Sequence, residues 1–492
     1  MLIDKNFRCG LLPALLVSLL ASLLASCATG PDYKRPAMAA PAAFKEAGDW
    51  KVAEPQDEQA RGKWWEVFGD AQLNALVDQV DINNQNLKIA EARYRQAQAL
   101  ASTARAGFFP SVGLSASDTR SRSGAGRSTV VGGLSSGSSG GINTNYNVAA
   151  NLSWELDLWG RIRRQTESND SSAQASAADL AAARLSAQAD LATSYFQLRV
   201  NDAQQQLLND TVTAYTKSLE LTRNRYNVGV AGRVDVAQAE TQLKSAQAQA
   251  LDLGVQRAQL EHSIALLLGR APSEFSLTVG NWSATLPRLP LALPASLLER
   301  RPDIAAAERR ASAANAQIGV AQAAYFPTLS FSASDGYASP SISKWLTAPN
   351  RFWSLGPSLA MTLLDFGKRS GAKDQALAAY DQSVATYRQT VLQGFQDVED
   401  NLAALRILEA EAVVQDEAVR SARESTTLTL NQYKAGTVSY LNVVSVQTAQ
   451  LSNERAAMSV QGRRLSAAVG LIRALGGGWE GNDSAGKKVV AK

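Results

Sequence analysis

The chain has 492 residues and is nearly neutral, with 49 Lys and Arg against 45 Asp and Glu. A nucleic-acid-binding protein concentrates basic residues on one surface, so we expect no nucleic-acid partner. The only histidine, His262, falls in an apolar helical stretch, and the four methionines add no recognisable metal-ligand spacing. No phosphate-binding loop or nucleophilic serine motif occurs either, so we expect no cofactor, no metal and no enzyme activity.

The first residues have the features of an export signal. A basic segment precedes an apolar stretch from Leu11 to Leu24, which is too short for a membrane-spanning helix of about 20 residues. The small residues that follow and Cys27 resemble a lipoprotein cleavage site, which predicts a signal peptide at 1–26 and lipidation of Cys27. Ala28 implies sorting to the outer membrane, and an incidental, unmodified cysteine is the alternative. We interpret the Pro- and Ala-rich residues 27–61 as a lipidated linker.

An internal duplication governs the rest of the chain. The segment YNVGVAGRVDV at Tyr226–Val236 returns as YKAGTVSYLNV at Tyr433–Val443, 207 positions later, and other matches keep this offset. A constant offset over about 110 residues indicates two copies of one unit. We therefore predict a first repeat at 62–270, a second repeat at 271–476 and a flexible tail at 477–492.

Each repeat is predicted to contain a helix, a β-hairpin and a long helical hairpin, in that order. In the first repeat these elements fall at 83–107, at about 108–157, and at 161–226 with 232–269, the tip being 226–236. In the second repeat they fall at 303–324, at about 325–364, and at 368–433 with 438–475, the tip being 433–443. The two shorter helices of a repeat together nearly equal its long helix, so we expect them to stack end to end beside it.

Alternating hydrophobicity predicts the strands. The return strand of the first hairpin alternates small polar residues with an apolar row, namely Tyr146, Val148, Ala150, Leu152, Trp154 and Leu156. Such a strand is long enough to span a membrane, and its polar face would suit a water-filled lumen. A soluble hairpin with one buried face is the alternative. Pro357 lies within the last predicted strand, where it removes a ladder hydrogen bond, and the sequence offers no explanation for it.

Seven-residue spacing in the helices predicts coiled-coil packing. One row of the second long helix contains Val384, Val391, Val398, Leu405, Ala412 and Val419. The four predicted strands are too few to close a membrane barrel, for which about eight is the usual minimum, so we expect the chain to oligomerise. A dimer, a trimer and a larger assembly all satisfy this requirement.

Eight segments of the chain resemble one known family, the TolC-like outer-membrane factors, and within it the lipoprotein (NodT-type) efflux channels. These segments are CATGPDYKRP, WWEVFGD, FFPSVG, WELDLWGRIR, LLERRPDIAAAE, LLDFGK, QDVEDNL and QYKAGTVSYLNV. The resemblance runs from Cys27 to about Gly476 and implies an α+β membrane protein. It further implies a homotrimer with a shared twelve-stranded β-barrel, four strands per protomer, and a long α-helical, coiled-coil-like periplasmic barrel.

The resemblance also implies a function. Family members are passive exit ducts in the outer membrane of Gram-negative bacteria, with a large periplasmic part. They receive substrates from an inner-membrane efflux pump through a periplasmic membrane-fusion adaptor protein. A structural or adhesive coiled-coil protein anchored in the outer membrane is the alternative. The transported substrate does not follow from the sequence.

Channels of this family are closed at the periplasmic end by polar contacts at the two hairpin tips. By position, Tyr433 matches a tip tyrosine of the family, and Tyr226 is its counterpart in the first repeat. Asn442 and Ser445 lie where relatives often carry aspartates that ring the constriction. The resemblance therefore does not extend to an acidic ring at the second tip.

The first tip offers a different set of charges. Asp235 would supply three carboxylates in a trimer, with Arg233 as a pairing partner. The alternative is that Asp235 caps a helix and Arg233 is a solvated turn residue. Gly229, Gly232 and Gly436 supply the backbone freedom that the two turns require.

Overall fold

The computed structural model describes residues 29–38, 44–47, 62–122, 142–280 and 301–477. The predicted signal peptide, Cys27 and residues 478–492 of the predicted tail lie outside these ranges. The chain divides into two compact units, the first made of Met1–Pro36, Arg95–Gln174 and Arg309–Ala385, the second of Ala37–Tyr94, Ala175–Glu308 and Thr386–Lys492. Each unit therefore takes segments from both sequence repeats.

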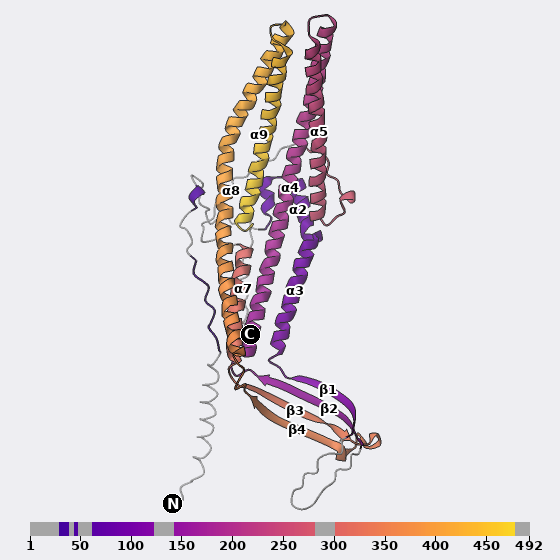
Figure 1. Ribbon diagram of the computed structural model, residues 1–492, viewed down its shortest axis with the longest axis vertical. Helices are drawn as coiled ribbons and strands as arrows, with labels where there is room; N and C mark the ends of the chain where they lie inside the picture. Colours follow the sequence, from indigo (N-terminus) through magenta and orange to yellow (C-terminus); the bar gives the residue numbers. More distant parts are fainter. Residues whose placement is uncertain (1–28, 39–43, 48–61, 123–141, 281–300, 478–492) are drawn as a thin grey trace, which may run out of the picture. The chain divides into compact units, whose positions relative to one another are not determined.

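The first unit contains an antiparallel sheet built from both repeats (Figure 1). Its strands are β1 (Ser111–Arg122), β2 (Ile142–Leu156), β3 (Thr328–Ser339) and β4 (Arg351–Ala360), in the order β1-β2-β3-β4. The register places Leu152 opposite Val112 and Ala333, and it places Ala333 opposite Leu355. The apolar rows of the four strands therefore lie on one face of the sheet, as the alternation predicted.

Pro357 lies opposite Phe331 in β4. Within the described part of this chain, β4 pairs with β3 only. Proline lacks the N–H that a strand residue donates to a neighbouring strand, and nothing in the structure explains a proline at this position.

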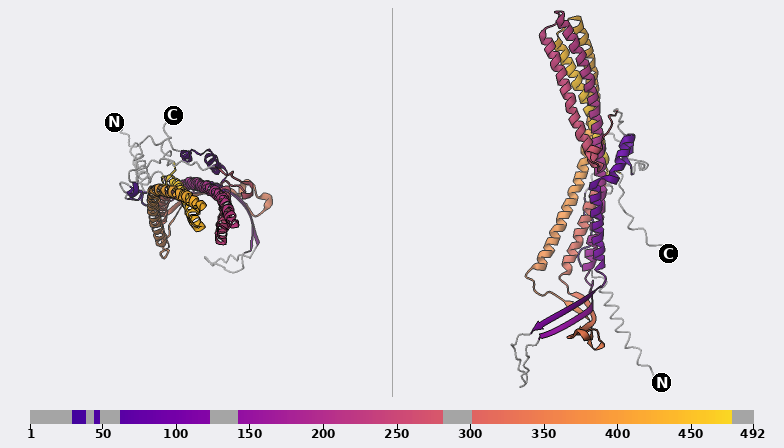
Figure 2. Two further views of the ribbon diagram at one scale, coloured as in Figure 1. Left: turned by 90° about the horizontal axis from the view of Figure 1, so that it is seen from above. Right: turned by 90° about the vertical axis from the view of Figure 1, so that its right-hand side faces the viewer.

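The second unit is helical, and Figures 1 and 2 show two helical hairpins side by side in it. One hairpin consists of α4 (Arg161–Asn227) and α5 (Arg233–Leu267), and the other of α8 (Lys368–Ala435) and α9 (Tyr440–Ala474); α4 up to Gln174 and α8 up to Ala385 belong to the first unit. Of the shorter helices, α2 (Ala71–Asn83) lies in the second unit, whereas α3 (Gln85–Ala106) and α7 (Pro302–Ala323) begin in the second unit and end in the first. None of the described helices combines the length and the hydrophobicity needed to cross a membrane.

The seven-residue row of α8 lies on the packed side of that helix. Five of its six members are buried, namely Val391, Val398, Leu405, Ala412 and Val419. A residue that returns every seven positions stays on nearly the same side of a helix, so the row keeps facing its neighbours. The largest apolar cluster of the second unit includes Leu191, Phe196, Ile264 and Leu471, each with no exposed surface.

The helix predicted at 83–107 is α3 (Gln85–Ala106), and a separate helix that was not predicted, α2, precedes it. α2 ends at Asn83, and α3 begins at Gln85, because Asn84 has an extended backbone with φ −61° and ψ 121°. The Asn84 Oδ1 atom accepts a hydrogen bond from the Leu87 backbone N–H at 3.1 Å, as an N-cap does. Composition alone does not distinguish a capping asparagine from one within a helix.

The same joint occurs in both repeats with different side chains. The Asn84 side-chain amide donates to the Leu267 carbonyl oxygen at 2.8 Å, where α5 ends. The Arg301 guanidinium occupies the matching position before α7 and donates to the Ala474 carbonyl oxygen at 3.3 Å, where α9 ends. α5 therefore ends beside the start of α3, and α9 ends beside the start of α7, as the lengths predicted.

Part of the predicted linker at 27–61 is docked in the second unit. The Phe44 side chain is 6% exposed and belongs to the main apolar cluster. The Glu399 carboxylate accepts hydrogen bonds from the backbone N–H groups of Lys45 and Glu46, at 2.7 and 2.9 Å. Composition did not reveal this docking, because Glu399 lies more than 350 positions away along the chain.

Replacing Asp70 with Ala should destabilise the second unit by about 2–4 kcal/mol. Asp70 Oδ1 accepts from the Gln72 and Leu73 backbone N–H groups, and Oδ2 accepts from the Tyr195 hydroxyl at 2.7 Å. Tyr195 is 2% exposed, and burial raises the pKa of Tyr195 to about 12. The substitution would leave both a helix start and a buried hydroxyl without an acceptor. Denaturant unfolding of the purified protein in detergent measures the loss.

The matched control is Asp78→Ala on the same helix. Asp78 is exposed and pairs with Lys63 at 3.1 Å, and exposed pairs of this kind contribute about 1 kcal/mol or less. Equal unfolding midpoints for the two variants would contradict the role of Asp70.

Candidate functional site

The two hairpin tips turn in the same way. In the first tip Gly229 has φ 77°, and its N–H donates to the Tyr226 carbonyl oxygen at 2.9 Å. In the second tip Gly436 has φ 83°, and its N–H donates to the Tyr433 carbonyl oxygen at 3.0 Å. Both glycines have the left-handed backbone conformation that commonly ends an α-helix. A residue with a side chain adopts this conformation only with strain.

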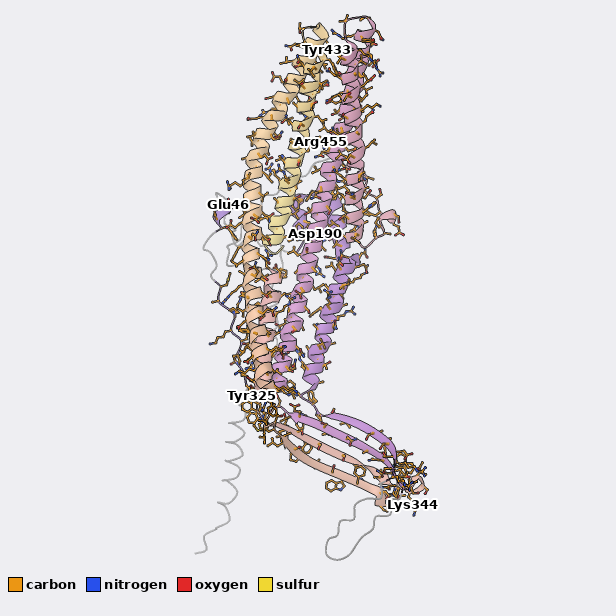
Figure 3. All side chains as sticks on the ribbon, viewed as in Figure 1. Glu46, Asp190, Tyr325, Lys344, Tyr433 and Arg455 are labelled. Atoms are coloured by element: carbon orange, nitrogen blue, oxygen red, sulfur yellow. The ribbon has the colours of Figure 1, made fainter. Side chains whose placement is uncertain are left out.

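The two matching tip tyrosines lie in different environments. Tyr433, labelled in Figure 3, is 3% exposed and stacks edge-on against Tyr440 at 5.3 Å between ring centroids. Its hydroxyl donates to Thr222 Oγ1 on α4 at 3.4 Å. Tyr226 is 42% exposed. Only the tyrosine of the second repeat therefore links the two hairpins.

A small apolar and polar core lies beneath the tips. The Tyr440 hydroxyl lies 3.2 Å from Ser218 Oγ, and the Tyr215 hydroxyl accepts a bond from Gln242 at 3.1 Å. Burial raises the pKa of Tyr440 and of Tyr215, so both hydroxyls stay protonated at neutral pH. These neutral hydroxyl groups link α4 to α9 and to α5 without adding charge.

Arg225 joins the first tip to the second. Its Nη1 atom donates to the carbonyl oxygens of Tyr433 and Lys434, at 2.9 and 3.0 Å. Its guanidinium carbon also lies 4.7 Å from the centroid of the Tyr433 ring. The last carbonyls of a helix lack partners within the helix, and a cation is favoured there by the helix dipole. Arg225 therefore fills the open end of α8 from the other hairpin.

Sequence reasoning missed Arg225. The residue that matches Arg225 in the second repeat is Gln432, 207 positions later. Because the two residues differ, comparing the repeats did not point to Arg225. The tips differ at most other positions as well, so the sequence contains no signal that would have found Arg225.

Asp235 caps its own helix. Its Oδ2 atom accepts from the backbone N–H of Gly232, the residue before α5, at 3.1 Å. Among the described residues, Asp235 forms no ion pair with Arg233, which is exposed. Within one chain, Asp235 therefore acts as a helix cap and Arg233 is a solvated residue, which is the alternative named for them above. Their charges do not pair within one chain.

Asn442 and Ser445 lie on the exposed side of the first turns of α9. The Ser445 hydroxyl donates to the Leu441 carbonyl oxygen of the same helix at 3.0 Å. Neither residue carries a charge, so the second tip presents polar, uncharged side chains at these positions.

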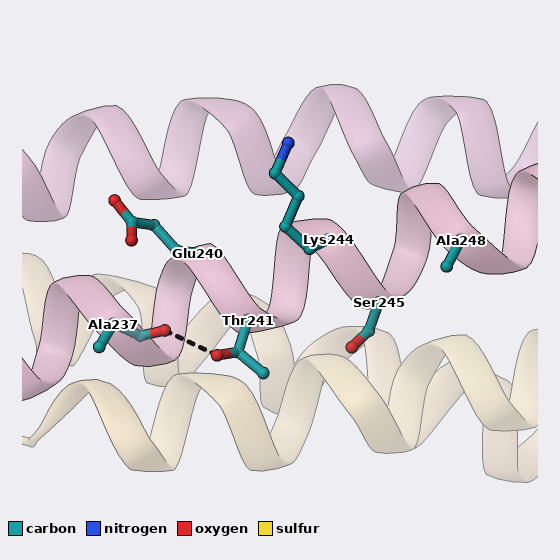
Figure 4. A pocket seen from close by; sticks show the side chains of 6 residues that line it. All are labelled: Ala237, Glu240, Thr241, Lys244, Ser245 and Ala248. Carbon is teal, nitrogen blue, oxygen red and sulfur yellow. Dashed lines mark hydrogen bonds between the residues drawn. The ribbon is translucent and has the colours of Figure 1, made fainter.

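An open groove runs along α5 next to the first tip (Figure 4). Its lining residues are Ala237, Glu240, Thr241, Lys244, Ser245 and Ala248. Arg223 of α4 donates to Glu240 at 2.6 Å, and this hydrogen bond lowers the pKa of Glu240. The groove offers small side chains and a few charges, which suits contact with another helix more than chemistry on a small molecule. Among the described residues, no three His, Cys, Asp or Glu side chains gather where they could hold a metal ion.

Comparisons with known proteins identify the family. The family model for outer membrane efflux proteins matches residues 76–270 and 293–477. The solvent efflux pump outer membrane protein SrpC of Pseudomonas putida is 32% identical over 460 residues, covering 92% of this chain and 96% of that protein. The pyoverdine export outer membrane protein OpmQ of Pseudomonas aeruginosa is 30% identical over 456 residues, covering 92% and 94%.

Solved structures agree with this match. The outer-membrane channel OprN has a TM-score of 0.83 at 31% identity, covering 92% of this chain and all of that one. The open state of the Neisseria gonorrhoeae MtrE outer membrane channel has a TM-score of 0.80 at 27% identity, covering 92% and 99%. These matches confirm the expected fold and favour the efflux channel over a structural or adhesive protein. The chain belongs to the outer membrane efflux protein family.

Proposed function

We propose that three copies of this chain form a passive duct through the outer membrane and that the two hairpin tips close its periplasmic end. The sheet of one chain supports the oligomer, because β1 and β4 each have a neighbour on one side only. Unpaired strand edges are costly in lipid, so the four strands require partners from other copies, and three copies supply twelve.

Exposed apolar side chains support the same assembly. Trp353, Leu355 and Leu359 of β4 are 63–73% exposed, as expected for side chains that contact lipid. On the helices, Leu251 of α5 and Val414 of α8 are also exposed. Such apolar side chains on the helices are best covered by neighbouring copies of the chain.

The duct carries out no chemical conversion in this proposal. It receives substrate from an inner-membrane pump through a periplasmic adaptor, whose helices would contact the tips and the α5 groove. The names of relatives include pumps for toluene and for solvents and an exporter of pyoverdine. Because these cargoes differ so widely, we assign selectivity to the pump and not to the duct.

Lipidation of Cys27 is part of the proposal. It rests on the apolar stretch and the small residues before Cys27, and on the docking of the chain from Thr29 onward. Acyl chains would add a second membrane attachment to that of the strands. The absence of any other cysteine after residue 27 means that no disulfide takes part in stabilising the mature chain.

The contact that carries the closed-tip proposal is Arg225 on the end of α8. In planar bilayers, the purified oligomer should give discrete single-channel steps of low conductance. Protein dissociated by heating before reconstitution is the control and should give none. An assembled oligomer that never conducts, even after its tips are loosened by substitution, would contradict the duct.

A further inference from the structure

Residues 29–32, which begin two positions after Cys27, are bound by side chains and backbone groups of the first unit. The backbone N–H and the hydroxyl of Thr29 both donate to the carbonyl oxygen of Trp159, at 3.1 and 2.8 Å. The side-chain amide of Asn315 on α7 donates to the Pro31 carbonyl oxygen at 2.8 Å. The segment is therefore held through its backbone, by residues from two different repeats.

Arg164 of α4 forms the centre of this site. Its side chain is 8% exposed, and its Nε donates to the Thr29 carbonyl oxygen at 3.2 Å. Its Nη2 donates to the Gly30 carbonyl oxygen at 3.4 Å and to the Asp32 carboxylate at 2.7 Å, while Nη1 pairs with Glu167 at 2.8 Å. Because Asp32 is largely exposed, the bonds to the half-buried carbonyl oxygens of Thr29 and Gly30 contribute most of the specificity.

Two glycines allow the segment to lie against α7. Gly30 has φ 98°, and a Cβ added there would lie 2.5 Å from the Gly319 Cα atom. A Cβ added at Gly319 would lie 2.7 Å from the Thr29 carbonyl oxygen and 2.8 Å from the Arg164 Cγ atom. No side chain fits at either contact, so the surface of α7 is shaped for this stretch of backbone.

The site lies where the helices meet the strands. Trp159 follows β2, and its indole N–H donates to the carbonyl oxygen of Pro327, directly before β3, at 2.7 Å. Its ring stacks on Phe326 at 4.9 Å between centroids. Phe109 and Phe366, at other strand–helix junctions of this unit, are 71% and 93% exposed. Aromatic side chains at the ends of membrane strands lie at the level of the lipid headgroups.

We propose that Arg164, Asn315 and Gly319 form a binding site for the residues after Cys27, which fixes where the lipid anchor of this chain enters the membrane. Cys27 lies two residues before Thr29, so the Cα atoms of these two residues are at most about 7 Å apart. The anchor would then enter the lipid beside the aromatic side chains at the strand–helix junctions. This inference rests on the lipidation proposed above, although the docking itself does not need the lipid.

The first test uses amide hydrogen exchange of the full-length, purified protein in detergent. The Thr29 amide should be protected, and it should exchange about tenfold faster or more in Arg164→Ala and in Gly319→Ala. Asn315→Ala removes a single bond and should have a smaller effect, which keeps the test informative if a stronger variant does not fold. The matched control is Arg105→Ala, because Arg105 pairs with Asp170 at 2.8 Å in the same unit without touching the segment.

The second test measures the position of the anchor. A nitroxide spin label is attached to Ala28→Cys in the otherwise unchanged protein. The label should be immobilised there and accessible to oxygen dissolved in the lipid. When Arg164→Ala is added, the label should become mobile. Intact mass of each sample reports lipidation separately. An unmodified Cys27 would contradict the lipidation proposed above. Two other results would overturn the binding site alone: a lipidated protein whose Thr29 amide exchanges rapidly, or a spin label whose mobility does not change in Arg164→Ala.

Discussion

Arg225→Ala should raise the single-channel conductance of the reconstituted protein. The substitution removes two hydrogen bonds from a guanidinium to the end of α8, together with the contact to the Tyr433 ring. Hydrogen bonds to charged groups contribute about 1.5–3 kcal/mol each when buried, and Arg225 is only half-buried. A loss of about 1.4 kcal/mol already shifts a two-state equilibrium tenfold, so the open population should rise by roughly one order of magnitude.

Two neighbouring substitutions test whether the conductance depends on the Arg225 contact or on the stability of the tips in general. Arg233→Ala removes an exposed charge from the same tip and should leave the conductance unchanged. Asp235→Ala removes the bond to the Gly232 N–H, which costs about 1 kcal/mol of local helix stability but breaks no contact between the hairpins of one chain. If Asp235→Ala raised the conductance and Arg225→Ala did not, a ring of carboxylates at the first tip would hold the gate instead.

Asp202→Ala should be the most destabilising single substitution that we consider. The Asp202 side chain is 1% exposed, and its two oxygens accept from Arg199 at 2.9 Å and from Arg257 at 2.8 Å. Arg199 also donates to the Thr278 carbonyl oxygen at 3.0 Å, so the network joins α4, α5 and the segment after α5. Removing one member of a buried ion pair typically costs about 3–5 kcal/mol, because the remaining charges stay buried without a partner.

The second repeat supplies a matched control for this prediction. Glu409 is 207 positions after Asp202, but its side chain is 72% exposed and lies 3.9 Å from Arg464. An exposed pair contributes about 1 kcal/mol or less, so Glu409→Ala should have little effect on the unfolding midpoint in denaturant. A similar shift for the two variants would show that the Asp202 network contributes no more than a surface pair.

Much of the fold could be predicted from the sequence, because it depends on periodicity. The alternation in 146–156 and the seven-residue row of α8 each record which side of an element is packed, and the structure places both as expected. The helix α2 and the break at Asn84 that separates it from α3 were missed, because the hydrogen bonds of Asn84 to Leu87 and Leu267 decide this break and composition does not.

The candidate site was less accessible from the sequence. The roles assigned to Asp235, Asn442 and Ser445 remain predictions, since they concern contacts between copies of the chain. Arg225, which ties the two tips together, was missed because its partners are the carbonyl groups of Tyr433 and Lys434, more than 200 positions away. Every residue has a backbone carbonyl, so no sequence pattern predicts which side chain will bind a particular one.

The sequence by itself determined the duplication, the alternation of strands and long helices, and the family, because each is recorded in spacing along the chain. The tertiary structure decided where matching positions of the two repeats differ in burial and in contacts. Tyr226 is exposed whereas Tyr433 is buried, and an asparagine at one joint, Asn84, corresponds to an arginine at the other, Arg301. The physical reason is that two copies of one unit do not have the same neighbours once they pack side by side. Burial, partners and charge are then set by contacts between distant residues, which only the folded chain brings together.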